Sequence, residues 1–174
     1  AHGLVGSEMC IRDRFQSIKM DKSLKIIGGG MAGCEAAWQA ANMGIQVTLY
    51  EMRPKVKTFA HQTEKLGEMV CSNSFRSNDH EQNAVGLLHW EMMRANGLVI
   101  STAYEHKLPA GGALAVDRDE FANSITNKLK SHPNIKISYE EVTSLPNEGK
   151  WIVATGPLTS CLLYTSDAAD EAIG

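Results

Sequence analysis

A glycine-rich turn between two short apolar runs constrains the fold of this 174-residue chain more than any other feature. Residues 24–27 (LKII) and residues 45–50 (IQVTLY) read as strands, and a helix of small residues lies between them. The turn has the spacing G-x-G-x-x-G. This order of strand, turn, helix and strand predicts a Rossmann-like unit that binds a dinucleotide, whereas an ordinary glycine-rich turn is the alternative.

Each glycine of this turn has an expected task. Gly28 permits a tight turn, Gly30 lets the backbone approach a pyrophosphate, and Gly33 lets the helix lie close to the strand. The phosphates would meet N–H groups at the helix N-terminus, where the helix dipole favours anions. Glu51 ends the second strand, where an acceptor for ribose hydroxyls is expected. The predicted cofactor-binding residues of this unit are Gly28, Gly29, Gly30, Met31, Ala32, Gly33 and Glu51.

The two ends of the chain read as translated sequencing adapters rather than native protein. Residues 9–14 (MCIRDR) can be encoded by DNA whose reverse complement encodes residues 161–165 (CLLYT). We therefore expect adapter-like tails at residues 1–14 and 161–174. Residues 22–160 would then be a partial nucleotide-binding domain, truncated before its sheet is complete. Natural tails that resemble adapters are the alternative.

Composition narrows the class of protein. The tails hold two basic and five acidic residues, so the rest of the chain carries 15 of each, from 17 basic and 20 acidic in all. This neutral segment has no basic field that would indicate nucleic-acid binding. Its two cysteines, Cys34 and Cys71, are too few for a disulfide framework or a zinc site, so no metal is expected. No apolar run is long enough to span a membrane, and a cytoplasmic setting is expected.

The remaining sequence alternates helices and strands around one long polar loop. Residues 55–83 read as this loop, in which residues 64–70 are a candidate short helix. One helix is predicted over residues 84–95, and a second begins at a capping box of Asp117 and Glu120. The expected buried faces of these helices comprise Val85, Leu88, Met92, Phe121, Ile125 and Leu129. Further strands are predicted over residues 135–139 and 151–154. The fold class is therefore α/β, a parallel Rossmann-like sheet with flanking helices and ligands at the carboxyl ends of its strands.

Several longer motifs resemble a known family. The segments EMVCSNSFRSN, NAVGLLHWEM and PAGGALAVDRDEF, together with GGGMAGCEAAWQ and LYEMRP, are similar to bacterial folate- and FAD-dependent tRNA (uracil-5-)-methyltransferases. The resemblance runs from about residue 22 to residue 160. It implies an FAD-binding domain and an enzyme that takes a one-carbon unit from 5,10-methylenetetrahydrofolate and reduces it with FADH2. The methyl group would end on carbon 5 of a T-loop uridine in tRNA, and NAD(P)H would re-reduce the flavin.

The same resemblance implies roles for particular residues. It places the FAD pyrophosphate on residues 28–33, the adenosine ribose at Glu51 and the catalytic thiol at Cys71. A thiolate that adds to carbon 6 of uracil makes an enolate whose carbon 5 can attack an activated methylene group. The alternative is that Cys71 is a small buried residue beneath a loop.

Five other residues have two interpretations each. Arg53 approaches the cofactor or is a solvated charge at the end of a strand. Gly111 and Gly112 lie near the flavin in the family, or form a plain turn. Gly156 resembles the second small-residue crossing over the dinucleotide, or simply ends a strand. We predict cofactor contact for these four residues. For His61, contact with flavin or folate and a surface position both stay open.

Two other functions remain possible from the sequence. One is the related FAD protein family that helps to install a carboxymethylaminomethyl group on wobble uridine of tRNA. The other is a non-catalytic dinucleotide-binding module. Because the predicted sheet is incomplete, the chain as written is expected to be inactive by itself.

Overall fold

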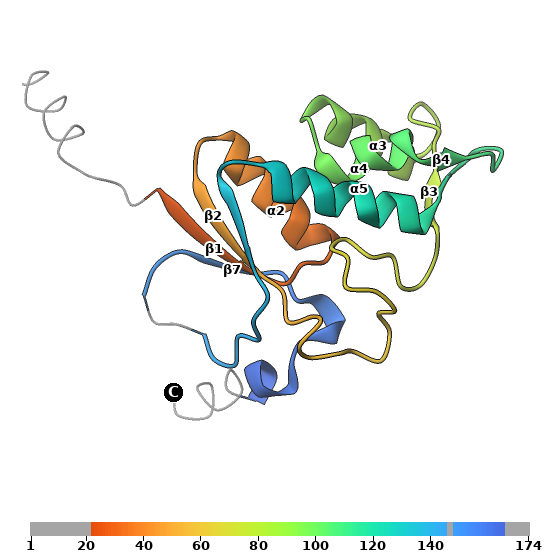
Figure 1. Ribbon diagram of the computed structural model, residues 1–174. Helices are drawn as coiled ribbons and strands as arrows, with labels where there is room; N and C mark the ends of the chain where they lie inside the picture. Colours follow the sequence, from red (N-terminus) through yellow and green to blue (C-terminus); the bar gives the residue numbers. More distant parts are fainter. Residues whose placement is uncertain (1–21, 146–147, 166–174) are drawn as a thin grey trace, which may run out of the picture.

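The computed structural model describes residues 22–145 and 148–165 of the chain. Within these residues a parallel sheet and a smaller antiparallel sheet form, with helices packed against both (Figure 1). The parallel sheet has the strand order β6-β2-β1-β7. Its strands are β1 (Ser23–Ile27), β2 (Gln46–Tyr50), β6 (Ile135–Ser138) and β7 (Trp151–Val153). The predicted α/β class and all four of these strands are confirmed.

Small residues let helix α2 (Met31–Asn42) lie close to the parallel sheet. Cys34 and Ala37 are fully buried on the helix, and Ile26 and Leu49 are fully buried on the strands below it. Alternate residues of β1 and β2 point to this face, as expected for strands with one face in the core. The opposite face carries a stack of the Tyr50 and Trp151 rings.

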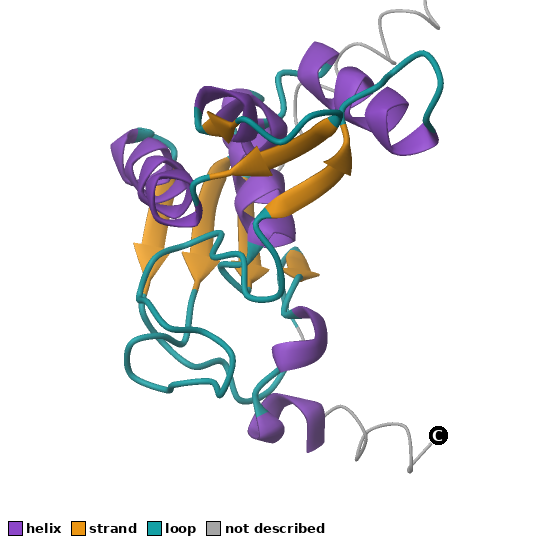
Figure 2. Ribbon diagram, turned by 90° about the vertical axis from the view of Figure 1, so that its right-hand side faces the viewer, coloured by secondary structure: helices purple, strands orange, loops and turns teal. Residues whose placement is uncertain are grey.

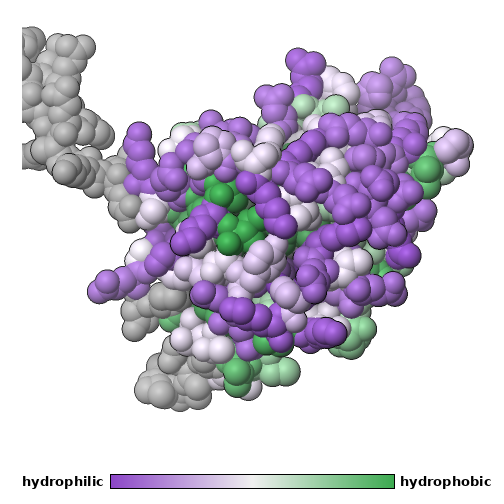
Figure 3. Space-filling view, in the orientation of Figure 1, coloured by the Kyte–Doolittle hydropathy of each residue, from purple (hydrophilic) through white to green (hydrophobic). Residues whose placement is uncertain are grey.

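Helix α5 (Arg118–Ser131) begins where the sequence indicated. The Asp117 side chain accepts hydrogen bonds from the backbone N–H groups of Asp119 and Glu120, at 3.0 and 3.1 Å. The predicted buried face is confirmed, because Phe121, Ile125 and Leu129 are all fully buried. The outer side of this helix is hydrophilic (Figure 3).

The antiparallel sheet occupies the other side of the molecule, beyond α5 in Figure 1. It has the order β3-β5-β4 and is accompanied by two further helices. The elements are β3 (Ser74–Ser77), α3 (Ala84–Arg94), α4 (Leu98–Glu105), β4 (Lys107–Leu108) and β5 (Ala113–Val116). Helix α4 joins the two halves, since Glu35 of α2 accepts the N–H groups of Leu98 and Val99 at its N-terminus.

Two local predictions were wrong. Residues 64–70 form no helix, because the Leu66 N–H donates to the Thr126 hydroxyl and the Gly67 N–H to the Gly29 carbonyl. Helix α3 exists, but its expected buried face is exposed at Leu88, which is 53% exposed. Its buried residues are instead Gly86 and His89. Strands β3, β4 and β5 and helix α4 were not predicted, because their pairing and burial depend on segments that sequence patterns do not link to them.

No helix within the described ranges combines the length and apolarity needed to cross a membrane.

Candidate dinucleotide-binding site

A cavity of about 380 Å³ lies at the carboxyl ends of the parallel strands. Figure 2 shows these strands running in one direction, with their arrowheads toward the loops that surround the cavity. Its volume is within the range of about 300–1,000 Å³ that is usual for small-molecule sites. Every strand of the sheet contributes: the lining includes residues 28–32 after β1, 50–53 at the end of β2, 140–142 beyond β6 and 154–158 after β7.

The three glycines of the turn differ in the space around them. Gly28 has φ of +106°, and a Cβ atom there would lie 2.6 Å from the carbonyl oxygen of Ala154. A Cβ atom on Gly33 would lie 1.9 Å from the carbonyl oxygen of Gly28, so α2 crosses directly over the end of β1. A Cβ atom on Gly30, in contrast, would meet no atom of residues 22–145 or 148–165 within 4 Å. Gly28 and Gly33 therefore shape the turn, while the backbone at Gly30 is open to an incoming group.

The N-terminus of α2 suits an anion. Gly30 is its N-cap residue, no side chain among the described residues caps this end, and no acidic residue lies in its first turn. Met31 and Ala32 of the first turn line the cavity. Uncapped N–H groups at the positive end of a helix dipole bind phosphate oxygens. The residues present therefore fit the diphosphate of a dinucleotide.

A buried ion cluster forms one wall of this cavity. Arg53 lies 3.0 Å from Glu51 and 3.1 Å from Glu68, and the side chains of these three residues are between 4% and 10% exposed. Of the two interpretations of Arg53, cofactor contact and a solvated charge, the second is wrong because the residue is buried. The cluster connects the end of β2 to the loop over residues 55–70.

Both carboxylate oxygens of Glu51 are engaged by protein donors. Oε1 accepts from the backbone N–H and Nε of Arg53, and Oε2 accepts from the Gly29 N–H and Arg53 Nη2. Burial acts to raise the pKa of Glu51, but the hydrogen bonds from Arg53 and Gly29 outweigh it and hold the pKa below its usual value. Four donors fill the capacity of a carboxylate. A ribose hydroxyl must therefore share or displace one of them.

His61 reaches the cavity from the long loop. Its Nδ1 lies 2.6 Å from Thr58 Oγ1, which also accepts the His61 backbone N–H at 3.1 Å. Burial and the Arg53 charge lower the pKa of His61. The imidazole is therefore mostly neutral at neutral pH.

The other predicted glycines of the site lie in two places. Gly156 lines the cavity and begins the short 3-10 helix η1 (Gly156–Leu158). Gly111 and Gly112 form the exposed turn between β4 and β5 and do not line this cavity. The structure thus brings Gly156 to the candidate site but leaves Gly111 and Gly112 outside it.

The two cysteines within residues 22–160 differ in their exposure to solvent. Cys34 is fully buried, its thiol donates to the Gly29 carbonyl, and burial raises its pKa to about 12. Cys71 is exposed, so a small buried residue is the wrong description of it. It lies between Val70, which lines the cavity, and Ser72, which lines a second, more open depression together with Arg118.

The segment that follows η1 closes one side of the cavity. The Ser160 hydroxyl donates to Glu141, and Leu163 is 4% exposed and lines the cavity. Residues 161–165 are helical. Leu163 belongs to the predicted adapter-like tail, so that tail occupies space beside the candidate site.

Several lining residues were not predicted from the sequence: Glu68, Glu140, Glu141 and Val142. For the last three a signal existed, because they follow a predicted strand of a parallel sheet, where ligands gather. For Glu68 no local signal existed, since its partner Arg53 is 15 residues away and the chain returns through an irregular loop.

The sequence around this site matches a known protein family. The sequence profile described as "Glucose inhibited division protein A" matches residues 23–171. The chain belongs to the glucose inhibited division protein A family. The matched range runs past residue 160, and the predicted boundary there stays a prediction.

Two curated relatives of this member of the glucose inhibited division protein A family carry the same name. The methylenetetrahydrofolate–tRNA-(uracil-5-)-methyltransferase TrmFO of Ruegeria sp. (strain TM1040) is 72% identical over 141 residues, covering 81% of this chain and 32% of the relative. The protein of the same name from Jannaschia sp. (strain CCS1) is 70% identical over 147 residues, covering 84% and 32%. These matches confirm the family resemblance seen in the sequence motifs. The chain spans about a third of the length of the curated relatives it matches.

A solved structure supports the fold. The GidA protein of Aquifex aeolicus matches with a TM-score of 0.55 at 20% identity, covering 72% of this chain and 21% of that chain. At this level of identity the likeness concerns the fold alone.

Proposed function

We propose that this chain is the dinucleotide-binding part of an FAD- and folate-dependent tRNA (uracil-5-)-methyltransferase. The observation that carries the proposal is the open backbone at Gly30, beside the uncapped start of α2, in a cavity to which all four parallel strands contribute. This geometry suits a dinucleotide diphosphate. The names of the curated relatives supply the reaction and its substrates.

In this proposal the turn residues divide the work of binding FAD. Gly30, Met31 and Ala32 meet the diphosphate, while Gly28 and Gly33 hold the turn in shape. Glu51 faces the adenosine ribose through an oxygen that it shares with Gly29 or Arg53, and Gly156 lines the same cavity. When bound and reduced, FAD supplies the hydride that turns a transferred methylene group into a methyl group. Gly111 and Gly112 would contact the flavin only if it extends beyond this cavity.

Cys71 is the proposed nucleophile. Its thiol is exposed on the loop that leaves the cavity wall at Val70, so a nucleic-acid base can reach it. Addition of the thiolate to carbon 6 of uracil makes carbon 5 nucleophilic, and the enolate then attacks the activated methylene carbon. Loss of the proton on carbon 5 lets tetrahydrofolate leave the methylene carbon, and a hydride added to that carbon then expels the thiolate from carbon 6 and leaves a methyl group on carbon 5.

The partners follow from this reaction. They are tRNA with its T-loop uridine, 5,10-methylenetetrahydrofolate, and NAD(P)H as the source of electrons for the flavin. The cytoplasm, where tRNA is modified in bacteria, is the proposed location. Residues 22–160 are the proposed native FAD-binding part, flanked by adapter-like residues 1–14 and 161–174.

The test uses the full-length protein from the uninterrupted gene, with Cys71→Ala and the control Cys34→Ser. Cys71→Ala should keep the flavin absorbance but lose T-loop methylation by about a thousandfold or more, because a lost nucleophile removes the covalent step. Cys34→Ser replaces the thiol that donates to the Gly29 carbonyl with a hydroxyl that can donate in the same way. This variant should retain both the flavin absorbance and the methylation activity. Methylation by Cys71→Ala at the rate of the unmodified protein would overturn the role of this thiol.

A second measurement separates the proposal from wobble-uridine modification. Nucleoside mass spectrometry of tRNA from a deletion strain should show loss of 5-methyluridine. Loss of the carboxymethylaminomethyl nucleoside instead would favour the other FAD-dependent activity.

A further inference from the structure

The charges around the cavity leave few groups that can receive an anion. Four carboxylates line it within the described residues: Glu51, Glu68, Glu140 and Glu141. The guanidinium of Arg53 is the single permanent cation in the described lining. Four of its five N–H donors are already bonded to Glu51, Glu68 and the Thr63 carbonyl. A diphosphate in this cavity therefore needs a donor besides Arg53.

Besides the N–H groups at the start of α2, His61 has a ring nitrogen that can supply a side-chain donor. Thr58 Oγ1 accepts the His61 backbone N–H and lies 2.6 Å from its Nδ1. In the arrangement where the Thr58 hydroxyl donates to Nδ1, the ring proton is on Nε2. Among residues 22–145 and 148–165, no protein group is hydrogen-bonded to that Nε2 atom. A ligand can therefore accept a hydrogen bond from it.

The loop holds this ring firmly against the cavity. Immediately after His61, the Gln62 and Thr63 N–H groups donate to Glu68 at 2.8 and 3.1 Å, and the Thr63 hydroxyl donates at 2.7 Å. Glu68 is fixed in turn by Arg53 Nη1 at 3.1 Å. These bonds, with those to Thr58, anchor the backbone on both sides of His61. A donor that is positioned before binding loses little conformational entropy when the ligand arrives.

We propose that His61 is a ligand-contacting residue of the FAD site, with Nε2 donating a hydrogen bond to the diphosphate of the bound dinucleotide. The inference rests on the proposed function, because it takes the cavity to be the FAD site. It adds a side-chain donor to the backbone N–H groups of α2.

Proton uptake should accompany this contact. Burial and Arg53 keep the pKa of His61 low, and the attraction of Glu68 and Glu51 only partly opposes them. A diphosphate adds negative charge near the ring and raises this pKa. Between the lower pKa of the free protein and the higher pKa of the complex, binding takes up a proton. Affinity for the dinucleotide therefore rises as the pH falls through this window.

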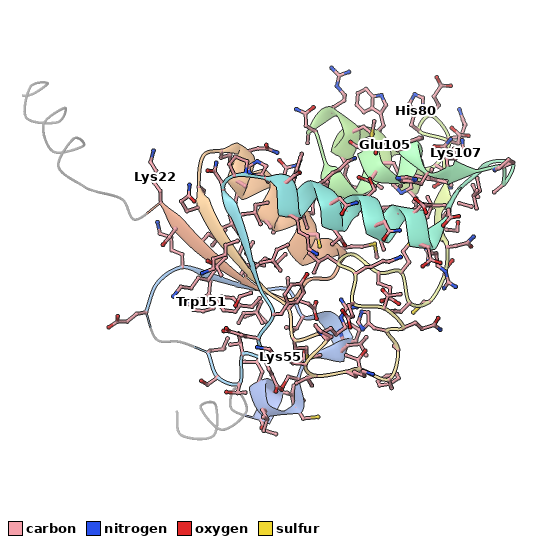
Figure 4. All side chains as sticks on the ribbon, in the orientation of Figure 1. Lys22, Lys55, His80, Glu105, Lys107 and Trp151 are labelled. Atoms are coloured by element: carbon pink, nitrogen blue, oxygen red, sulfur yellow. The ribbon has the colours of Figure 1, made fainter. Side chains whose placement is uncertain are left out.

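The experiment is titration calorimetry on the full-length protein stripped of flavin. FAD and ADP are titrated separately at several pH values, in two buffers of different ionisation enthalpy. The variants are His61→Ala, His61→Gln and the control His80→Gln, whose imidazole is exposed on the far side of the molecule, beside α3 (Figure 4). Thermal unfolding of each variant verifies that it is folded.

His61→Ala should weaken the binding of FAD and of ADP by about tenfold each and remove the proton uptake. His61→Gln retains an N–H donor, so it should recover part of the affinity without the proton uptake. His80→Gln should bind as the unmodified protein does. Unchanged affinity and proton uptake in both His61 variants would overturn the proposal.

Two further outcomes separate the possible failures. Weaker binding of FAD with unchanged binding of ADP would place the contact on the flavin half and overturn the diphosphate assignment. No binding of either ligand to the unmodified protein would overturn the proposed function itself, and this inference with it.

Discussion

Helix α2, against the parallel sheet, and helix α3, beside the antiparallel sheet, bury their apolar side chains to very different degrees. On the parallel side, Ile26 and Leu49 are fully buried beneath α2. On the antiparallel side, helix α3 leaves Leu88 53% exposed and Trp90 43% exposed. His80 stacks on the Trp90 ring and Arg94 lies over it, but no segment in the described part of the chain buries Leu88. An apolar pattern thus predicted α3 and α5 as helices, but it predicted the buried face correctly only for α5.

The largest expected effect is a difference in the free energy of unfolding between substitutions at two glycines in equally tight contacts. Gly33→Ala and Gly86→Ala would each place a Cβ atom 1.9 Å from a carbonyl oxygen, of Gly28 and Asp79 respectively. Gly28 cannot move without disturbing β1 and the turn, so Gly33→Ala should reduce the free energy of unfolding by about 3 kcal/mol or more. Asp79 lies on an exposed turn that can shift, so Gly86→Ala should cost about 1 kcal/mol.

Urea denaturation followed by tryptophan fluorescence measures both values. Gly30→Ala is the control on the same turn, because its Cβ atom meets no neighbour. It should leave stability within about 1 kcal/mol while it weakens FAD binding. Equal losses for Gly33→Ala and Gly86→Ala would show that the two halves resist strain alike.

The second prediction compares a buried ion pair with an exposed one. Arg53→Met leaves Glu51 and Glu68 buried without their cation, and should cost about 3 kcal/mol. Lys65→Met removes a 3.6 Å pair with Asp119, whose carboxylate side chain is 78% exposed, and should cost less than about 0.5 kcal/mol. Thermal unfolding at neutral pH checks both. A cost below 1 kcal/mol for Arg53→Met would mean that water enters the cluster and replaces the guanidinium.

Sequence reasoning succeeded where the determining contacts are local. The glycine spacing, the cap at Asp117 and the stripe of Phe121 and Ile125 are patterns within one turn or one helix, and the structure has all of them. The parallel arrangement of the strands could be predicted because strands that are joined through a helix pair in parallel.

The parts that sequence reasoning missed depend on distant partners. Strand β3 pairs with β5, so Ser74 faces Ala115 from 41 positions away. Glu68 becomes part of the site only because an irregular loop returns it to Arg53. No periodicity within the loop encodes either contact, and the short helix predicted within it over residues 64–70 does not form.

The third prediction concerns pH and the antiparallel half. Burial lowers the pKa of His89, although a hydrogen bond with the Ser77 backbone partly opposes this, and its Nδ1 has no hydrogen-bond partner in the described structure. Below about pH 6.5 the unfolded chain binds more protons at this residue than the folded chain, so stability falls as pH falls. The slope from one such group is at most about 1.4 kcal/mol per pH unit.

His89→Gln should flatten this dependence, measured by urea denaturation between pH 5 and pH 7. His61, on the parallel side, also has a lowered pKa, so a smaller slope should remain. The exposed His80 gives the control variant His80→Gln. An unchanged slope in His89→Gln would place the acid sensitivity elsewhere in the molecule.

The smallest expected effect tests the uncovered helix directly. Leu88 on α3 and Leu129 on α5 are the same residue type in the same kind of element, but one is 53% exposed and the other fully buried. In this chain Leu129→Ala should cost about 3 kcal/mol, since it opens a cavity in the core. Leu88→Ala should cost less than about 0.5 kcal/mol, since water already contacts that side chain.

The same pair of variants in the full-length protein extends the comparison. If Leu88→Ala then costs 1 kcal/mol or more, a segment outside the described residues covers α3 in the full-length protein. The contrast between the two helices would then be a property of the 174-residue chain alone. If the cost stays small, the exposed face persists in the complete protein.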